Sequence, residues 1–107
     1  MSSENQFSLS NKVVVVTGGT GILGGSFVKA IAQAGGIPVI MGRNAAIAEA
    51  RAQEIIQNGG QALAIVADVL QEADLIKARD LIVEKLGRID GLVNGAGGNM
   101  PEGVVQP

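Results

Sequence analysis

Hydrophobic residues along this chain form short continuous runs that alternate with segments of helical periodicity. The continuous runs predict strands buried on both faces, as in a parallel sheet, and they span 13–17, 37–41, 62–67 and 91–94. Between them, apolar side chains recur three or four positions apart, which predicts amphipathic helices. The predicted inward faces are Phe27, Ala30, Ile31 and Ala34 in the first helix, Ala48, Ala52 and Ile55 in the second, and Leu75, Ala78, Ile82 and Leu86 in the third, over 72–86.

Turn-forming residues mark the ends of these elements. Asn44 is placed to cap the second helix, which runs to about residue 58, because its side chain can accept a hydrogen bond from the first turn. Gly35-Gly36 is expected to end the first helix, as a glycine in the left-handed region commonly does, and Asn58-Gly59-Gly60 and Gly87 are expected to end the other two. Pro38 has no N–H to donate, so it is expected where the second strand begins and not in the middle of the ladder.

The alternation of four strands and three helices predicts an α/β fold built on a doubly wound, Rossmann-like parallel sheet. Crossovers between parallel strands are right-handed. The strand order expected for this pattern is 3-2-1-4, with the nucleotide crossing where the order reverses. Residues 1–11 precede the first strand and are expected to be a loosely held lead-in. No repeat or interdomain linker is present, so residues 1–107 are interpreted as parts of a single domain.

The composition excludes several kinds of site and partner. The chain has no cysteine, histidine, tyrosine or tryptophan, which removes disulfides, the commonest metal ligands and the commonest general base. A formal net charge of −2 gives no reason to expect nucleic acid or an anionic membrane as a partner. The polar start does not resemble a signal peptide, and no apolar run approaches the roughly 20 residues that span a bilayer. A cytoplasmic protein without a metal site is expected.

A glycine-rich segment follows the first apolar run directly and opens the first predicted helix. Its sequence is Thr17-Gly18-Gly19-Thr20-Gly21-Ile22-Leu23-Gly24. A helix that starts there directs its unpaired N–H groups and the positive end of its dipole at whatever lies above the turn, which suits a phosphate. The spacing Gly-x-Gly-x-x-Gly fits the dinucleotide-binding fingerprint. The alternative is an ordinary glycine turn that lets the helix pack close to the strand.

Suggestive residues follow the other three predicted strands as well. The carboxyl ends of parallel strands meet at one edge of the sheet, where doubly wound folds bind their ligands. These residues are Arg43 and Asn44 after the second strand, Asp68 and Val69 after the third, and Asn94, Gly95, Ala96 and Gly97 after the fourth. Two of them have simpler interpretations, since Asp68-x-x-Gln71 is also a capping-box pattern and Asn94-Gly95 is also a turn dipeptide.

Together these motifs resemble the N-terminal part of a short-chain dehydrogenase/reductase, over about residues 9–100. The glycine segment fits Thr-Gly-x-x-Gly-x-x-Gly, whereas the commoner form of the motif has its middle glycine where this chain has Ile22. Asn94-Gly95-Ala96-Gly97 departs at one position from the usual Asn-Asn-Ala-Gly. The run over 92–99 further resembles the branch described as mannonate or fructuronate oxidoreductases.

The resemblance implies three groups of residues around a nicotinamide dinucleotide. Those under the diphosphate and the nearby ribose would be Gly18, Thr20, Gly21, Ile22 and Gly24. Those at the adenine would be Asp68, which accepts from the amino group, and Val69, which lines the ring. Those that line the ribose and hold the fourth strand near the first would be Asn94, Ala96 and Gly97.

The residues after the second strand bear on the choice of cofactor. An NAD-specific site usually has an acidic residue about 20 positions after the glycines, where it accepts from the ribose 2′-hydroxyl. Here that position holds Arg43, beside Asn44, and the nearest carboxylate is Glu49. Because a guanidinium suits a 2′-phosphate, NADP is expected in preference to NAD.

The family's catalytic residues are missing from this sequence. Members use a tyrosine acid/base, a lysine four residues later, an orienting serine and an asparagine, and this chain has no tyrosine. No catalytic residue is assigned, and the 107 residues alone should be inactive. The resemblance implies a longer parent enzyme, a homo-oligomer that moves a hydride between the nicotinamide and a carbonyl or secondary alcohol of a small-molecule substrate, with a sugar acid indicated by the narrower likeness.

A non-catalytic sensor or scaffold module that binds a dinucleotide is the alternative to an enzyme. It is less favoured because the fourth strand of a complete module this small would be a bare apolar edge. A P-loop is disfavoured because no Gly-Lys-Ser/Thr closes the glycine segment. A methyltransferase would usually have an acidic residue after the second strand.

Overall fold

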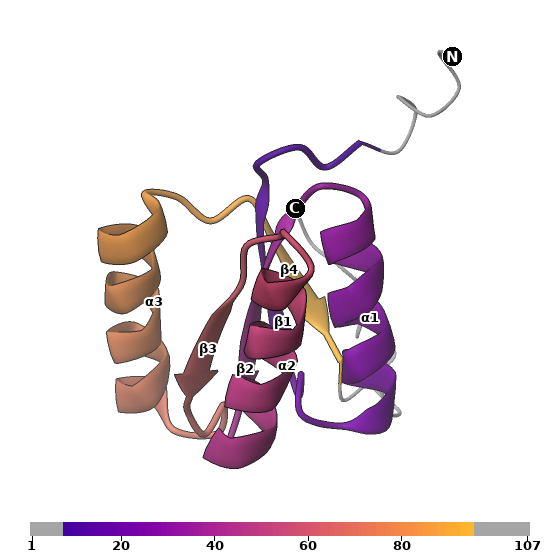
Figure 1. Ribbon diagram of the computed structural model, residues 1–107. Coiled ribbons are helices and arrows are strands. Elements are labelled where there is room, and N and C mark those ends of the chain that lie inside the picture. Colours follow the sequence, from indigo (N-terminus) through magenta and orange to yellow (C-terminus); the bar gives the residue numbers. More distant parts are fainter. Residues whose placement is uncertain (1–7, 96–107) are drawn as a thin grey trace.

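The computed structural model describes residues 8–95, which form a parallel sheet with helices on both faces (Figure 1). The elements are β1 (Val13–Thr17), α1 (Ile22–Gln33), β2 (Ile37–Gly42), α2 (Ala45–Gln57), β3 (Leu63–Val66), α3 (Glu72–Leu86) and β4 (Gly91–Asn94). Every predicted strand and helix is present.

The strands lie in the order β3-β2-β1-β4, and each neighbouring pair is parallel. This confirms the predicted Rossmann-like topology. In the middle of the sheet, Val15 of β1 lies opposite Val39 of β2 and Leu92 of β4. The carboxyl end of β1 therefore lies between those of β2 and β4, so the loops that follow the three strands meet at one edge.

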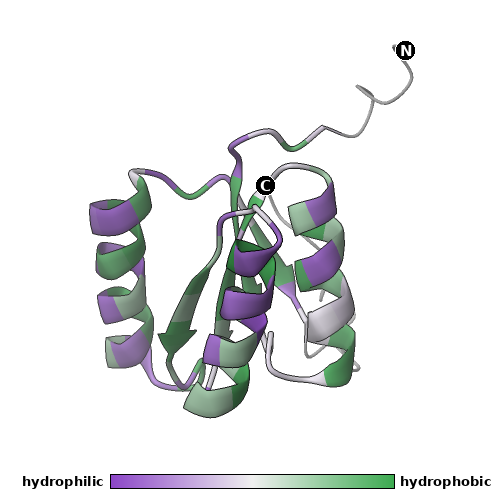
Figure 2. Cartoon of the chain, viewed as in Figure 1, coloured by the Kyte–Doolittle hydropathy of each residue, from purple (hydrophilic) through white to green (hydrophobic). Residues whose placement is uncertain are grey.

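The four valines of β1 divide between two hydrophobic clusters. Val13 and Val15 face α3, whereas Val14 and Val16 face α1 and α2 on the other side of the sheet. Because side chains alternate along a strand, an unbroken apolar run is what a strand covered on both faces requires. Each buried side chain of this size contributes about 1.5–3 kcal/mol. Figure 2 shows the result, with green strands enclosed by helices that carry their purple residues outward.

The buried face of α1 differs from the predicted one. Gly24, Val28 and Ile31 are buried, whereas Ala30 is exposed and Phe27 is half-buried. The start of the helix explains the difference, because Gly24 is pressed against the glycine turn and this contact sets the rotation of the helix. The residues four and seven positions later then face the sheet.

The buried faces of α2 and α3 agree better with the faces predicted from the spacing of apolar residues. The buried residues are Ala48, Ala52 and Ile55 in α2 and Ala78 and Ile82 in α3. In α3, Leu86 is half-buried, but Leu75 in the first turn is 37% exposed.

The predicted helix ends are confirmed. The Asn44 side chain accepts a hydrogen bond from the Ile47 N–H (3.0 Å) and caps α2. Gly35, Gly59 and Gly87 follow α1, α2 and α3 with φ of +89°, +95° and +85°, in the left-handed region that glycine adopts most easily.

Pro38 occupies a place in β2 where its missing N–H costs little. The preceding Ile37 N–H donates to the Lys12 carbonyl (2.8 Å) on the β1 side. Successive residues of a strand bond to opposite neighbours, so the Pro38 nitrogen faces β3. The ladder between β2 and β3 begins only at Val39, one residue later. The proline therefore lies at the beginning of the strand, as predicted.

Of the predicted lead-in over 1–11, residues 1–7 lie outside the described residues. The N–H groups of Leu9 and Asn11 donate to the Ala34 and Gly35 carbonyls (2.8 and 3.1 Å), which attaches the chain to the end of α1 just before β1. None of the helices within residues 8–95 is long and apolar enough to cross a membrane.

Asp90 ties the beginning of β4 to the beginning of β1. Its carboxylate accepts from the Val13 N–H (2.8 Å) and from the Arg88 guanidinium (2.7 Å), while its own N–H donates to the Val13 carbonyl (2.8 Å). The hydrogen bond from Arg88, together with that from Val13, holds the pKa of Asp90 below its usual range. The ionised carboxylate therefore helps to align the two strands.

This lowered pKa predicts how stability depends on pH. The contribution of Asp90 is present above the unfolded-state pKa of about 4 and is lost as pH falls through the lower folded-state value. Asp90→Asn should lower the melting temperature at neutral pH, and its difference from the wild type should shrink in acid. Asp80→Asn, in an exposed ion pair of α3, is the control and should change little. A difference for Asp90→Asn that stays constant across this pH range would contradict a role for the charge.

Candidate functional site

The glycine segment forms a tight turn at the carboxyl end of β1. Gly18 has φ of +66°, and the Gly21 N–H donates back to the Gly18 carbonyl (3.0 Å). The Gly19 N–H donates to the Met41 carbonyl (3.0 Å), which attaches the turn to the end of β2. The turn is therefore held at the end of β1 by a contact with β2, next to the point between β1 and β4 where the strand order reverses and doubly wound folds bind their ligands.

The first turn of α1 is open to a ligand. Gly21 is the N-cap residue and has no side chain to satisfy the first N–H groups, and the first turn holds no acidic residue. By contrast, α2 is capped by Asn44, and α3 has Glu72 and Asp74 in its first turn. Among the helices of the described region, α1 is thus the one whose positive end is left to an external anion.

Gly24 brings α1 into direct contact with this turn. A Cβ at residue 24 would lie 2.1 Å from the Gly18 carbonyl oxygen and 2.8 Å from the Gly19 Cα, distances that real structures do not show. Ile22, which replaces the glycine of the commoner motif, is 92% exposed. Its side chain points away from the turn, so the departure from the motif does not fill the space that the turn encloses.

The end of β2 lies against the same turn. A Cβ on Gly42 would lie 2.6 Å from the Thr20 hydroxyl oxygen, so the strand end and the turn are in contact. Arg43 and Asn44 follow directly and are exposed. The Asn44 oxygen caps α2, so the donors that this loop can offer a ligand are the Asn44 amide nitrogen and the Arg43 guanidinium.

Asp68 takes part in the loop between β3 and α3, although not as a capping box. Its carboxylate accepts from the Leu70 N–H (2.9 Å), and its own N–H donates to the Asp74 carboxylate (2.9 Å). The N-cap of α3 is Gln71 instead, and no side chain caps it. Asp68 is half-buried and Val69 is 40% exposed, so both are accessible at the edge of the sheet.

The end of β4 closes the site on the other side of β1. The Gly95 N–H donates to the Thr17 carbonyl (2.6 Å), and the Thr17 hydroxyl lies 3.5 Å from the Asn94 side-chain oxygen. A Cβ on Gly95 would lie 2.7 Å from the Thr17 carbonyl oxygen and 2.9 Å from the Gly24 Cα. This contact gives a packing reason for the glycine at the position where the motif departs from Asn-Asn-Ala-Gly. Ala96 and Gly97 lie outside the described residues.

Arg51 belongs to the site although it was not predicted to. From α2, its Nη1 donates to the carbonyls of Gly19 (2.5 Å) and Gly21 (2.6 Å), both in the glycine turn. The sequence holds one signal of this role. Residue 51 lies three positions after Ala48 and four before Ile55, so it is a cation on the inward stripe of α2.

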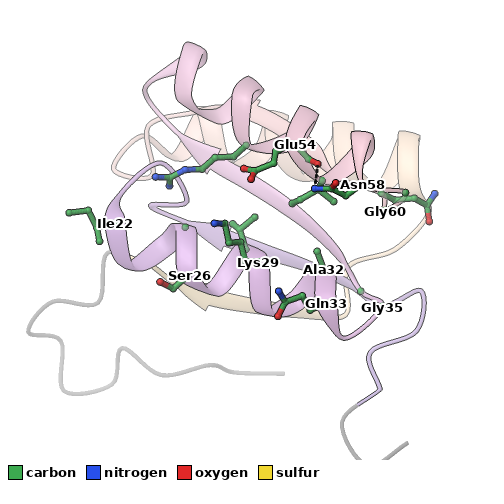
Figure 3. Close-up of a pocket in the computed structure, with 16 residues that line it drawn as sticks. Ile22, Ser26, Lys29, Ala32, Gln33, Gly35, Glu54, Asn58 and Gly60 are labelled. Carbon is green, nitrogen blue, oxygen red and sulfur yellow. Dashed lines mark hydrogen bonds between the residues drawn. The ribbon is translucent and has the colours of Figure 1, made fainter. Parts of the chain in front are cut away.

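A groove of about 880 Å³ lies between α1 and α2. Ile22 lies at one end of it, and Gly35 and Gly60 lie at the other (Figure 3). The groove is lined by residues of α1, of α2 and of the loops that follow them, and Ile22, Gly25 and Arg51 form its end near the turn. Apart from Ile22, the residues predicted from the sequence lie instead at the strand ends, so we place the candidate site there.

The structure therefore brings most of the predicted residues to one edge of the sheet. The turn from Gly18 to Gly24 contacts Gly42 on one side and Gly95 on the other. The loop that holds Asp68 is joined to this group through the Ala67 N–H, which donates to the Gly42 carbonyl (2.9 Å). Backbone N–H groups, a cation and a carboxylate thus lie along one edge of the sheet.

Comparisons with known proteins identify the family that the chain resembles. The profile of the short chain dehydrogenase family matches residues 12–106. The chain is similar to an uncharacterized oxidoreductase, UxuB, of Bacillus subtilis (38% identical over 97 residues, 91% of this chain and 35% of that protein). It is also similar to the 7alpha-hydroxysteroid dehydrogenase of Escherichia coli (35% identical over 102 residues, 95% of this chain and 40% of that protein).

A solved structure shows the same likeness. The fold superposes with a TM-score of 0.82 on a putative D-mannonate oxidoreductase from Haemophilus influenza with bound NAD, at 33% identity over 92% of this chain and 35% of that one. The chain thus spans between about a third and two fifths of the length of these relatives. The family profile matches nearly the whole of this chain, and the chain shares its fold with this solved structure. The chain therefore belongs to the short-chain dehydrogenase family.

Proposed function

We propose that this chain is the cofactor-binding part of an NAD(P)-dependent oxidoreductase that moves a hydride between the nicotinamide and a carbonyl or secondary alcohol. The observation that supports this most is the start of α1, where no side chain of residues 8–95 caps the helix and Gly24 packs directly against the turn. That cradle fits a diphosphate. When bound, the nicotinamide supplies or accepts the hydride; the residues of this chain bind and orient the dinucleotide.

Each group of residues contacts a different part of the cofactor, as the family resemblance implies. The diphosphate and the nearby ribose lie over the turn, against Gly18, Thr20, Gly21, Ile22 and Gly24. The Asp68 carboxylate accepts from the adenine amino group while Val69 covers the ring. Asn94 lines the ribose with Ala96 and Gly97.

NADP is the proposed cofactor in preference to NAD. The support is Arg43, which is exposed beside the turn and for which the structure records no ion pair within residues 8–95. The relative from Haemophilus influenza holds NAD, so the proposal rests on this residue of this chain. A 2′-phosphate on the adenosine ribose would give the guanidinium a charge-assisted partner.

The rest of the enzyme is proposed to lie in a longer protein. The chain has no tyrosine, so the acid/base group must come from further residues, in a Tyr-x-x-x-Lys segment. The likeness to a putative D-mannonate oxidoreductase supports a sugar acid as the substrate. We further propose that this longer protein is cytoplasmic and forms a homo-oligomer.

Turnover tests the proposed reaction directly. The full-length protein, incubated with NADP⁺ and a panel of hexonates, should accumulate reduced nicotinamide, measured by its absorbance. The control is the full-length protein with the tyrosine of its Tyr-x-x-x-Lys segment replaced by phenylalanine, which should bind cofactor without turnover. Tight binding by the full-length protein with no hydride transfer to or from any alcohol or carbonyl would instead favour a dinucleotide sensor.

Replacing Arg43 tests the cofactor preference. Arg43→Ala should weaken NADP⁺ binding by about 10–100-fold, since a hydrogen bond to a charged group is worth about 1.5–3 kcal/mol, and should leave NAD⁺ binding nearly unchanged. Calorimetric titration of both cofactors measures the ratio of the dissociation constants. Arg79→Ala, an exposed arginine of α3, is the control. An unchanged ratio in Arg43→Ala would refute the role.

Replacing Gly24 tests the diphosphate cradle. Gly24→Ala places a methyl group against the Gly18 carbonyl, so the helix start must move and binding of both cofactors should fall at least about tenfold, with a loss of stability of about 1–3 kcal/mol. Gly91→Ala is the matched control, because a Cβ there meets nothing closer than 3.9 Å. Calorimetry and thermal melts measure both effects. Wild-type affinity in Gly24→Ala would place the cofactor elsewhere.

A further inference from the structure

We propose that Arg51 is a positioning residue for the cofactor diphosphate, whose guanidinium holds the glycine turn in the conformation that directs its N–H groups at the phosphates. The inference rests on the proposed function, since it assigns a role in binding the same cofactor. It adds to the site a residue from the middle of α2, outside the sequence motifs.

The contacts of Arg51 are concentrated on the turn. A single nitrogen, Nη1, donates to the carbonyls of Gly19 (2.5 Å) and Gly21 (2.6 Å). The guanidinium also packs on the first turn of α1, where a Cβ on Gly25 would lie 3.0 Å from its Cζ. The residue is half-buried between the two helices. One side chain thus fixes two carbonyls of the segment that must keep its shape to bind an anion.

Peptide geometry connects these carbonyls to the ligand. In a planar trans peptide, the C=O and the next N–H point in opposite directions. Holding the Gly21 carbonyl toward α2 therefore turns the Ile22 N–H away from α2, and holding the Gly19 carbonyl does the same for Thr20. Gly21 can accept this bond as well as the first helical bond from the Gly25 N–H (3.0 Å), because a carbonyl oxygen has two lone pairs.

The positive charge of Arg51 also favours the binding of an anion at the turn. Within residues 8–95 the structure records no ion pair between Arg51 and a carboxylate. Its positive charge therefore adds to the partial charge at the start of α1, and both favour an anion above the turn. A 2′-phosphate is not required for this effect, which distinguishes Arg51 from Arg43.

The test compares both cofactors in the full-length protein. Arg51→Ala should weaken NAD⁺ and NADP⁺ binding by the same factor, about tenfold, and leave their ratio unchanged, whereas Arg43→Ala should change the ratio. Methylguanidinium added at low concentration should restore part of the affinity of Arg51→Ala and none in the wild type. Lys29→Ala is the control, because it removes a charge from the same groove and Lys29 makes no recorded hydrogen bond in the described region. This variant should bind both cofactors normally.

Other outcomes would overturn the inference. Loss of NADP⁺ binding alone would show that Arg51 contacts the 2′-phosphate, and a lowered melting temperature with unchanged affinities would show a purely structural role. If Arg51→Ala does not fold, Arg51→Lys decides the question, since an ammonium that replaces only part of the contact should give an intermediate affinity for both cofactors. A wild-type protein that binds neither cofactor would refute the proposed function itself, before any variant is measured.

Discussion

The contact between the start of α1 and the turn after β1 is the constraint on which the rest of the site depends. Gly24 lies so close to Gly18 that no side chain fits between them, and Gly95 packs against Gly24 from the end of β4. Helix, turn and strand therefore meet without intervening side chains. Within residues 8–95 no side chain caps the first N–H groups of α1, and the same contact sets the buried face of this helix.

The fold could be predicted because each strand and helix carries a local signal. The valines of β1 are apolar at every position because α3 covers one face of the strand while α1 and α2 cover the other. Asn44 and the glycines after the three helices marked helix ends, which the cap hydrogen bond and the left-handed backbone conformations confirm. The rotation of α1 could not be predicted, since it follows from a tertiary contact of Gly24 and not from the helix's own periodicity, which favoured Ala30.

Only those site residues that belong to sequence motifs were predicted. The turn, Arg43, Asp68 and Asn94 follow strands and could be placed at one edge from the topology alone. The capping box expected as an alternative at Asp68 is wrong, because the chain forms a local turn there and α3 begins at a later residue. Arg51 was missed because its partners are backbone carbonyls some 30 residues earlier, a contact that no spacing rule describes.

A crystal structure of the protein with NADP⁺ tests the central claim most directly. The account predicts the diphosphate within hydrogen-bonding distance of the N–H groups at the start of α1, with the adenosine end extended along the strand ends toward Arg43 and Asp68. A diphosphate bound in the groove between α1 and α2, or a turn left free of the cofactor, would contradict it.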